Sequence, residues 1–504
     1  MNRTLNSRLP QNEEIDKPQS NCGIIGVYGA ANASTLTYYG LHSLQHRGQE
    51  ASGIVSCQRA GEAAPASKLR IYKGPGLVTE VFSDPEIIND LLVGDVAIGH
   101  NRYSTTGSDN LENIQPFMVN YRDGQLAVAH NGNLTNTRSL RRKLQESGTI
   151  FQTSTDTEVF LHLTARSMAE TPEDRIMDAL NTVRGAYSLV MLHDDTLIAA
   201  RDPHGIRPLC IGRRGDAWVV ASETCALDIM QAEYVRDVAP GEVLFFDSRM
   251  GSNGKPVQRW LDEKPPQHHH CIFEYIYFSR PDSRVFEENV DKVRRKLGKV
   301  LAEEHPVADD ADHPVFVMAV PDSSNTAAVG FVRGAVKQGI DARVEIGLIR
   351  NHYIGRTFIQ PGQEKREVKV RMKFNTVKGV VEGRKVVIID DSIVRGTTSR
   401  LLINLIREAN PKELHVRISS PPIMSPCPYG MDFPSASELI AAQNDGDVEK
   451  IRREIGADSL GYLSVEKMLS SVSHEGKRSY CTGCFTGKYP VPVEENMRKD
   501  EHEV

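Results

Sequence analysis

The chain has 504 residues, of which 39% are hydrophobic, and its 60 basic and 66 acidic residues give a net charge of −6. This length exceeds one ordinary hydrophobic core and predicts two or three domains. The balance of charge argues against a nucleic-acid-binding protein, although a local basic patch could still hold a phosphorylated small molecule. No run approaches the roughly 18 apolar residues that a membrane span requires. We therefore expect neither nucleic acid nor membrane as a partner.

Eight cysteines are spaced irregularly, and no secretory signal precedes them, so a disulfide framework is not expected. Residues 1–21 are polar throughout and lack the apolar core of a signal peptide. They are either a disordered tail or a segment with a defined end at Cys22. Together these features favour a cytoplasmic location.

The first part of the chain, up to about residue 246, consists of short apolar runs between turns rich in Gly and Asn. Helical periodicity appears between these runs, notably around 158–168. The pattern predicts an α+β layer structure with antiparallel sheets. Residues 247–267 are rich in Gly, Pro, Lys and Asp and are typical of a connection. We place this first domain at 22–260.

The second part, after about Cys271, has a different pattern. Apolar strands such as 315–320 and 386–389 are followed by a small-residue loop and then a helix. This order predicts a parallel α/β sheet whose ligands lie beyond the carboxyl ends of the strands. We place this domain at 261–445 and assign 446–504 to C-terminal helices and a cysteine-bearing tail.

Five motifs follow one another in the first domain. Alone, Cys22 would more often be a buried strand residue. In this order, the motifs resemble the glutaminase domain of the N-terminal-nucleophile amidotransferases, and the resemblance covers essentially all of 22–240. It implies an αββα sandwich. The motifs are CGIIGVYG at 22–29, LQHRGQEASG at 44–53, GHNRYSTTG at 99–107, AHNGNLTN at 129–136 and TSTDTE at 153–158.

An N-terminal cysteine suits glutamine hydrolysis. A thiol attacks an amide as the thiolate, and free Cys titrates near pH ~8.5, so a base is needed. The α-amine of an N-terminal Cys has a pKa of roughly 7.7–8.0 and lies within reach of its own sulfur. That amine exists only if the Asn21–Cys22 bond is cut, so we interpret residues 1–21 as a propeptide.

The resemblance assigns the other glutaminase roles by position. Asn131 and Gly132 match the oxyanion-hole pair, one side-chain donor and one backbone donor. Arg102 matches the residue that binds the substrate α-carboxylate, and Asp156 the carboxylate that pairs with the α-ammonium. Arg47 matches an arginine near the nucleophile that contacts glutamine, but a structural ion pair explains it equally well.

The second domain contains VVIIDDSIVRGTT at 386–398, where two acidic residues end a buried strand and a Gly/Thr-rich turn opens a helix. This matches the signature of type I phosphoribosyltransferases. It implies that Asp390 and Asp391 hold the ribose hydroxyls and the shell of a Mg²⁺ ion, which Ser323 in the loop 319–327 also contacts. Helix N-termini and Gly-rich turns favour phosphate. The residues assigned to phosphoribosyl pyrophosphate in this motif are Asp390, Asp391, Ser392, Arg395, Gly396, Thr397 and Thr398.

A basic segment, 350–375, lies between these loops and is either a charged surface loop or, as the resemblance implies, a loop that closes over phosphoribosyl pyrophosphate. Arg371 and Lys373 are the cations that we assign to this ligand. The family's usual pattern has Arg where this chain has His352, which leaves one anion contact open. The other basic side chains of the segment are Arg356, Lys365, Arg366 and Lys369.

Four cysteines, Cys271, Cys427, Cys481 and Cys484, lie in segments that resemble the branch of this family with a [4Fe–4S] cluster, which implies that these thiolates are its ligands. Only the last two have a recognisable ligand spacing, and a four-cysteine zinc site is the alternative. The cluster would act structurally, by connecting distant segments.

Taken together, the chain is identified as a member of the amidophosphoribosyltransferases, in their propeptide-bearing, iron–sulfur branch. The resemblance implies that glutamine, phosphoribosyl pyrophosphate and water become phosphoribosylamine, glutamate and pyrophosphate, the committed step of purine synthesis. It also implies a homotetramer and feedback inhibition by purine nucleotides. The alternatives are another amidotransferase, which should lack the motif at 386–398, and a nucleotide-binding regulator, which would not need Cys22.

Overall fold

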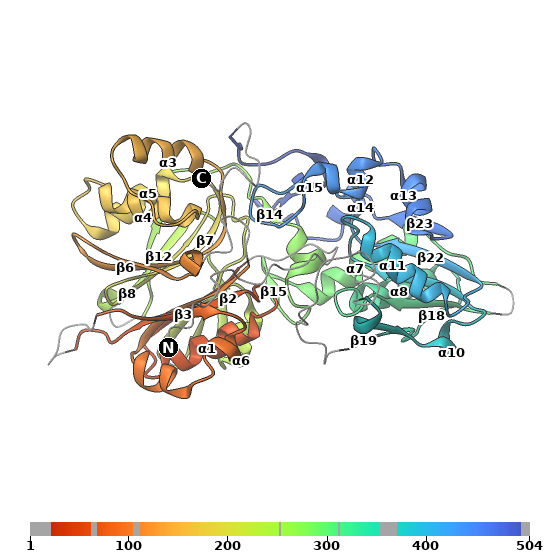
Figure 1. Ribbon diagram of the computed structural model, residues 1–504, viewed down its shortest axis with the longest axis horizontal. Coiled ribbons are helices and arrows are strands. Elements are labelled where there is room, and N and C mark those ends of the chain that lie inside the picture. The colour runs from red at the N-terminus through yellow and green to blue at the C-terminus, as the bar shows by residue number, and fades with distance from the viewer. Residues whose placement is uncertain are drawn as a thin grey trace, which may run out of the picture.

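The computed structural model describes residues 22–61, 68–103, 111–250, 254–310, 313–351 and 370–494. The segment interpreted as a propeptide and His352 lie outside these residues. The described chain forms two lobes, a glutaminase half on the left of Figure 1 and a transferase half on the right. Within the described residues, no helix combines the length and the apolar character needed to cross a membrane.

Two antiparallel sheets form the centre of the glutaminase half, as the alternation of apolar runs and turns predicts. The strand order of the first sheet is β11 (Glu233–Asp237), β9 (Cys210–Arg214), β10 (Ala217–Ala221), β1 (Gly23–Tyr28), β4 (Val96–Arg102), β2 (Ala51–Cys57) and β3 (Arg70–Pro75). The order of the second is β13 (Val257–Trp260), β12 (Glu242–Phe246), β8 (Thr196–Arg201), β7 (Gly185–His193), β6 (Gly124–Leu134) and β5 (Phe117–Tyr121).

Helices cover the outer face of each sheet, which makes the αββα sandwich that the sequence predicted. Alternate residues of β1 show why: Ile24 packs in the core between the sheets, whereas Ile25 packs against α1. The first sheet is covered by α1 (Ala33–Ser43), α2 (Val78–Val81) and α6 (Thr224–Ile229), and the second by α3 (Thr137–Glu146), α4 (Asp156–Arg166) and α5 (Pro172–Thr182). Single helical turns occur at Ile87–Leu91, Leu111–Asn113 and Ser248–Met250.

The transferase half contains the predicted parallel sheet, with helices on both faces. Its strand order is β18 (Ala342–Val344), β17 (Val315–Ala319), β21 (Lys385–Asp390), β22 (Glu413–Ile418) and β23 (Ser459–Tyr462). One face packs against α7 (Val290–Glu304), α8 (Asn325–Lys337) and α14 (Val465–Leu469), and the other against α11 (Thr397–Arg407) and α13 (Val448–Ile455). Shorter helices are α10 (Lys378–Val381), α12 (Ile440–Gln443), α15 (Gly483–Thr486), η4 (Glu274–Phe278) and η5 (Ala436–Glu438).

The boundary that the sequence placed at residue 445 does not coincide with the end of this sheet. Strand β23 pairs with β22 from beyond that point, and α13 packs on the same core. The sheet is therefore completed by residues that the sequence assigned to helices and a tail.

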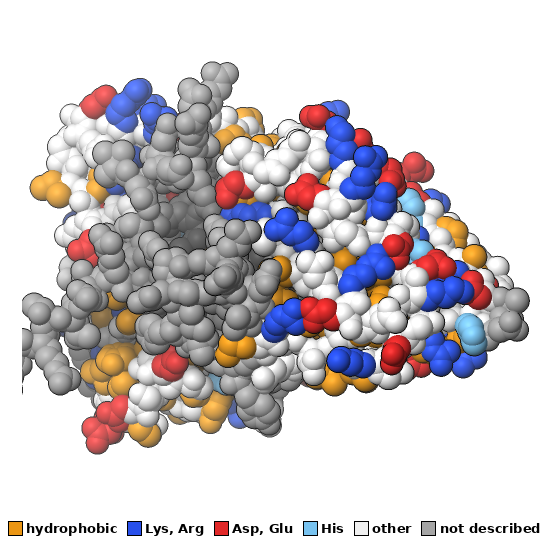
Figure 2. Space-filling view, turned by 45° about the vertical axis from the view of Figure 1, so that its right-hand side comes forward, with side chains coloured by type: hydrophobic (Ala, Val, Ile, Leu, Met, Phe, Trp, Pro, Cys, Tyr) orange, Lys and Arg blue, Asp and Glu red, His pale blue; other side chains and the backbone are white. Residues whose placement is uncertain are grey.

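The described residues also form three short two-stranded ladders. They are β14 (His270–Cys271) with β24 (Tyr480–Cys481), β15 (Arg284–Val285) with β16 (Glu288–Asn289), and β19 (Leu348–Arg350) with β20 (Phe374–Thr376). The last ladder brackets most of the basic segment. On the face shown in Figure 2, basic and acidic side chains are interspersed over the transferase half. We therefore expect an anionic substrate to be held by local groups rather than by a field of one sign.

Candidate active sites

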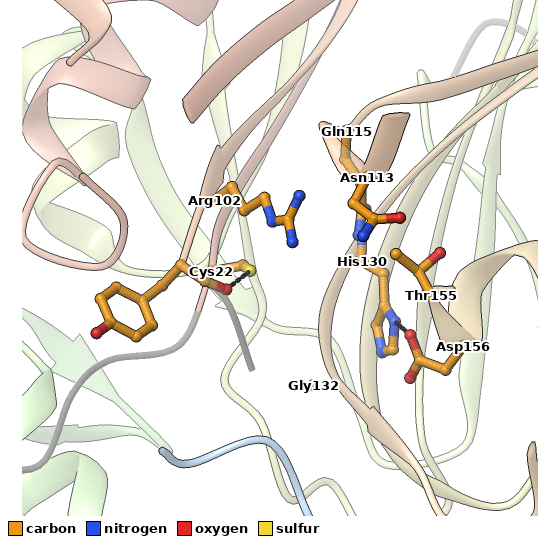
Figure 3. Close-up of a pocket in the computed structure, with 9 residues that line it drawn as sticks. Cys22, Arg102, Asn113, Gln115, His130, Gly132, Thr155 and Asp156 are labelled. Atoms are coloured by element: carbon orange, nitrogen blue, oxygen red, sulfur yellow. Dashed lines mark hydrogen bonds and ion pairs between the residues drawn. The ribbon is translucent and has the colours of Figure 1, made fainter. Parts of the chain in front are cut away.

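A pocket in the glutaminase half contains Cys22. It lies at one end of the sandwich. Figure 3 shows Cys22 and Arg102 on one side and His130 and Asp156 on the other. The lining residues are Cys22, Arg102, Tyr103, Asn113, Gln115, His130, Gly132, Thr155 and Asp156. The structure thus brings four of the six predicted glutaminase residues together in one pocket.

The Cys22 side chain is buried, and its thiol donates a weak hydrogen bond to the carbonyl oxygen of Tyr103 at 3.6 Å. Burial raises the pKa of this thiol to about 11, although the nearby Arg102 acts in the opposite direction. A group with this pKa is about 10⁻⁴ ionised at pH 7. The sulfur is therefore placed for attack but needs a base that accepts its proton.

Two opposite charges face each other across the pocket. Arg102 ends β4, and Asp156 begins α4, where a carboxylate is favoured by the helix dipole. Asp156 Oδ2 accepts a hydrogen bond from the backbone N–H of Leu134 at 2.8 Å, and its Oδ1 lies 3.6 Å from His130 Nδ1. These groups suit the carboxylate and the ammonium of an α-amino acid.

Asn131 and Gly132 lie near the end of β6. The Asn131 side chain is on the same face of the strand as Ala127 and Ala129, which pack between the two sheets. Both polar atoms of its amide are buried and have no hydrogen-bond partner among the residues that the structure describes. An orphaned buried amide is costly, so its persistence indicates a ligand that completes it. Asn131 does not line the pocket itself, although Gly132 does.

Gly132 occupies a position that only glycine fits. Its φ is +141°, and an added Cβ would lie 2.0 Å from the carbonyl oxygen of Ala186 on β7. The strand therefore approaches its neighbour closely at the point where its backbone enters the pocket.

The sequence did not single out several lining residues. His130 and Thr155 lie inside recognised motifs, so their positions were a usable signal. His130 should have been included among the predicted site residues, because its Nε2 atom is buried and has no hydrogen-bond partner within the described part of the chain. Tyr103 follows Arg102 in another motif. Asn113 and Gln115 lie in no motif, and no pattern in the sequence pointed to them.

Arg47 is fully buried, and its guanidinium donates to Glu223 and to Glu274 Oε2, the latter at 2.6 Å. These two carboxylates raise the pKa of Arg47 despite its burial. Arg47 does not line the pocket. The geometry favours the structural ion pair over the contact with glutamine, which stays a prediction.

A second polar site lies at the carboxyl end of β21, where Asp390 and Asp391 are both buried. Ser323 Oγ donates to Asp391 Oδ2 at 2.5 Å, and Ser392 Oγ donates to Asp391 Oδ1 at 2.6 Å. Ser324 Oγ donates to Asp390 Oδ1 at 3.2 Å. The loops after β17 and β21 therefore meet at one edge of the parallel sheet, where the sequence expected a ligand.

The turn 395–398, which the sequence predicts to hold a phosphate and which we call the phosphate loop, follows this acidic pair. Gly396 precedes α11 with φ +78°, and Thr397 and Thr398 form the first residues of the helix. The backbone N–H groups of such a turn are available to an anion. Arg395 contacts Glu438 Oε1 at 3.4 Å.

Arg371 lies apart from this loop in the described conformation, and Lys373 directly precedes β20. Arg371 Nη1 donates to Glu408 Oε2 at 2.8 Å, just beyond the C-terminal end of α11. That helix is roughly 16 Å long at 1.5 Å per residue, and the phosphate loop is at its other end. The structure thus does not bring Arg371 to the phosphate loop. Arg356, Lys365, Arg366 and Lys369 lie outside the described residues.

The four motif cysteines meet in the transferase half. Cys271 and Cys481 are direct partners in the ladder of β14 and β24. The carbonyl oxygen of Cys484 accepts the N–H groups of Met424 and Ser425 at 2.9 and 3.0 Å, close to Cys427. The connection, the transferase body and the tail therefore converge at these thiols.

Burial raises the pKa of the Cys271 thiol to about 12, and it raises those of Cys481 and Cys484 as well, with the neighbouring thiols adding to the effect. The backbone N–H of Tyr429 lies 3.4 Å from Cys427 Sγ. Amide donors to sulfur are a feature of thiolate ligand sites. No group of three or more His, Cys, Asp or Glu in the described segments is arranged to hold a single metal ion.

Comparison with known proteins gives matches to both halves. Residues 100–228 match the family of the glutamine amidotransferase domain. The chain is 49% identical to amidophosphoribosyltransferase 2, chloroplastic, of Arabidopsis thaliana, over 97% of its own length and 83% of that protein's. It is 48% identical to the amidophosphoribosyltransferase of Bacillus subtilis, over 95% of its own length and 96% of that protein's.

Two solved structures match over the whole fold. One, described as the allosteric regulatory enzyme of purine biosynthesis, has a TM-score of 0.86 at 46% identity and covers 96% of this chain and 99% of that chain. The other is the B. subtilis amidotransferase complexed with ADP and GMP, with a TM-score of 0.84 at 47% identity and coverages of 94% and 98%. The chain belongs to the amidophosphoribosyltransferases, the glutamine-dependent enzymes that convert phosphoribosyl pyrophosphate to phosphoribosylamine in purine biosynthesis.

Proposed function

We propose that glutamine binds in the pocket of Cys22 and is hydrolysed there to supply ammonia to the transferase half. The observation that supports this best is the set of groups in one cavity. A thiol, a guanidinium and a carboxylate line the same cavity as the glycine that we assign to the oxyanion hole. Arg102 binds the α-carboxylate of glutamine and Asp156 its α-ammonium, which directs the side-chain amide towards the sulfur.

The chemistry then proceeds in two balanced steps. Cys22 Sγ attacks the amide carbon, the amide leaves as ammonia with the proton of the thiol, and a thioester remains. Water hydrolyses this thioester to glutamate and restores the thiol. Each step passes through a tetrahedral oxyanion, which the Asn131 side chain and the Gly132 backbone N–H stabilise. The orphaned amide of Asn131 acquires its missing acceptor in that state.

Arg102→Ala tests the binding role. We expect the KM for glutamine to rise roughly 100-fold, which corresponds to about 2.7 kcal/mol for the loss of charge-assisted hydrogen bonds. Synthesis from external ammonia should be unchanged, because it needs no α-carboxylate contact. Steady-state kinetics with each nitrogen source measure both. An unchanged KM for glutamine would assign Arg102 another role.

We further propose that phosphoribosyl pyrophosphate binds at the carboxyl edge of the parallel sheet. Asp390, Asp391 and Ser323 would hold the ribose and a Mg²⁺ ion, which prefers oxygen ligands and keeps several waters. The turn 395–398 would hold the 5′-phosphate. Closure of the basic segment would bring Arg371 and Lys373 to the pyrophosphate, and this requires Arg371 to leave Glu408.

Regulation, assembly and location are also proposals. The ADP and GMP in the B. subtilis relative support purine nucleotides as feedback inhibitors of this chain. A homotetramer remains the expected assembly. A cytoplasmic location agrees with the similarity to bacterial and archaeal relatives.

We also propose that residues 1–21 are a propeptide whose removal frees the α-amine of Cys22. An iron–sulfur cluster completes the proposal. Cys271, Cys427, Cys481 and Cys484 would ligate a [4Fe–4S] cluster, because the three segments that carry them converge and a backbone N–H lies close to Cys427 Sγ. When bound, the cluster would connect the three segments that converge there and would take no part in the reaction.

Cys484→Ser tests the cluster, with Cys57→Ser as the matched control because Cys57 lies in the sandwich core outside this set. We expect Cys484→Ser to lose its iron and acid-labile sulfide and to melt roughly 5–10 °C lower, as for a loss of about 2–3 kcal/mol. Cys57→Ser should keep its iron. Full iron content in Cys484→Ser would exclude this thiol as a ligand.

A further inference from the structure

Two residues of the transferase half, Pro428 and Gly430, touch the end of β6, the strand that carries the oxyanion-hole residues. Asn133 Nδ2 donates to the carbonyl oxygen of Pro428 at 2.8 Å. An added Cβ on Gly430 would lie 2.9 Å from the carbonyl carbon and oxygen of Gly132 and 3.3 Å from the nitrogen of Asn133. Gly430 therefore packs directly on the peptide that follows the oxyanion glycine.

The middle residue of this segment is held from the glutaminase half. Arg207 donates to the carbonyl oxygen of Tyr429 from Nη2 at 2.6 Å and from Nε at 3.2 Å. The Arg207 side chain is fully buried, and its Nη1 lies 3.5 Å from Glu274 Oε1. A buried guanidinium on a backbone carbonyl leaves that carbonyl little freedom.

Gly132 needs such support. Its φ of +141° is one that few residues adopt, and a glycine has no side chain that packs to hold it there. The backbone of Gly132 is flanked by Ala186 on one side and by Gly430 on the other. The direction of the Gly132 N–H depends on this backbone, and an oxyanion donor loses its effect when it is misplaced by a fraction of an ångström.

We propose that residues 428–430 form a brace that fixes the Gly132 backbone, which makes Asn133 and Gly430 positioning residues for glutamine hydrolysis. The proposal rests on the oxyanion role of Asn131 and Gly132. It places part of the glutaminase machinery on the transferase half: the hole is complete only when the segment from the other half is seated against it. Neither residue touches the groups that bind the α-carboxylate and α-ammonium.

The test uses the mature full-length enzyme with the substitutions Asn133→Ala, Asn133→Asp and Gly430→Ala. We expect the kcat of glutamine hydrolysis to fall roughly 10–100-fold in each, below the 10²–10³-fold cost of losing an oxyanion donor outright. The KM for glutamine and the rate of synthesis from ammonia should change less than about 3-fold. Asn133→Asp keeps the shape of the side chain but removes its donor, so it separates the hydrogen bond from the filling of space.

The matched control is Asn136→Ala. Asn136 lies three residues further along the chain, and its amide donates to the carbonyl oxygen of Thr182 at 3.0 Å, within the glutaminase half. Its kcat for glutamine should stay within about 2-fold of that of the parent enzyme. Asn131→Ala is measured in parallel. If it also retains full activity, the oxyanion assignment fails; if it alone loses activity, only the brace fails.

Two further outcomes would overturn the brace. Wild-type kcat in Asn133→Asp with a loss in Asn133→Ala would show that the side chain only fills space. Loss of ammonia-dependent synthesis in all three variants would show that the segment is needed for folding rather than for positioning Gly132.

Discussion

Cys22→Ala is expected to abolish glutamine-dependent synthesis while leaving synthesis from external ammonia within about 2-fold of the parent enzyme. Removal of a nucleophile typically costs on the order of 10⁴–10⁶ in rate. The effect should be confined to one nitrogen source because the thiol belongs to the glutaminase pocket, whereas the acidic pair and phosphate loop lie on the parallel sheet of the other half.

The measurement is the rate of pyrophosphate release with glutamine and, separately, with a high concentration of ammonium salt at a pH that supplies free ammonia. Cys225→Ala is a suitable control, since this thiol is buried beside α1 and does not line the pocket. Equal loss with both nitrogen sources and an intact melting temperature would mean that Cys22 is not restricted to ammonia generation.

Chain that retains the Asn21–Cys22 bond is expected to hydrolyse glutamine at least about 10³-fold more slowly than chain that begins at Cys22. The buried thiol, with its pKa near 11, is almost fully protonated at neutral pH. Cleavage creates an α-amine with a pKa of roughly 7.7–8.0, which accepts the proton only in its neutral form. For mature enzyme, kcat/KM for glutamine should therefore rise about tenfold per pH unit below this pKa and level off above it.

Intact mass identifies the two chain forms, and a glutaminase assay across pH 6–9 measures their rates. The ammonia-dependent activity of both forms should be similar, which controls for folding of the transferase half. Equal glutamine hydrolysis by the uncleaved form would require another base in the pocket, and His130 would then be the first residue to test.

The sequence predicted the helices and strands whose formation is determined by residues close together in the chain. The apolar run that ends at Tyr28 forms β1, and the apolar run that ends at Asp390 forms β21, which is followed by the helix at 397–407. Each run is short and is bounded by turn residues, a pattern that indicates a strand. The sandwich and the parallel sheet followed from these elements, and the comparisons support the same family.

Features that depend on distant partners were less accessible. The two interpretations of Arg47 could not be distinguished from the sequence, because its carboxylate partners are 176 and 227 residues away. Strand β23 was assigned to the helical tail, since a four-residue run is too short to show a period. Likewise, nothing in the segment around Gly430 indicates that it packs on Gly132. Each of these features is determined by contacts between residues far apart in the chain, and no local pattern in a single sequence reveals such contacts.

The pairing of β14 with β24 has a consequence for the order in which the molecule is made. All strands of the sandwich have left the ribosome soon after residue 260, and they can pair as synthesis continues. The partner of Cys271, however, is Cys481, which lies 210 residues further along the chain. The ladder that joins these two segments therefore cannot form until residue 481 has also been synthesised. At roughly 5–20 residues per second this interval lasts about 10–40 s. Synthesis of the segment around Cys481 thus sets the earliest time at which this ladder can form.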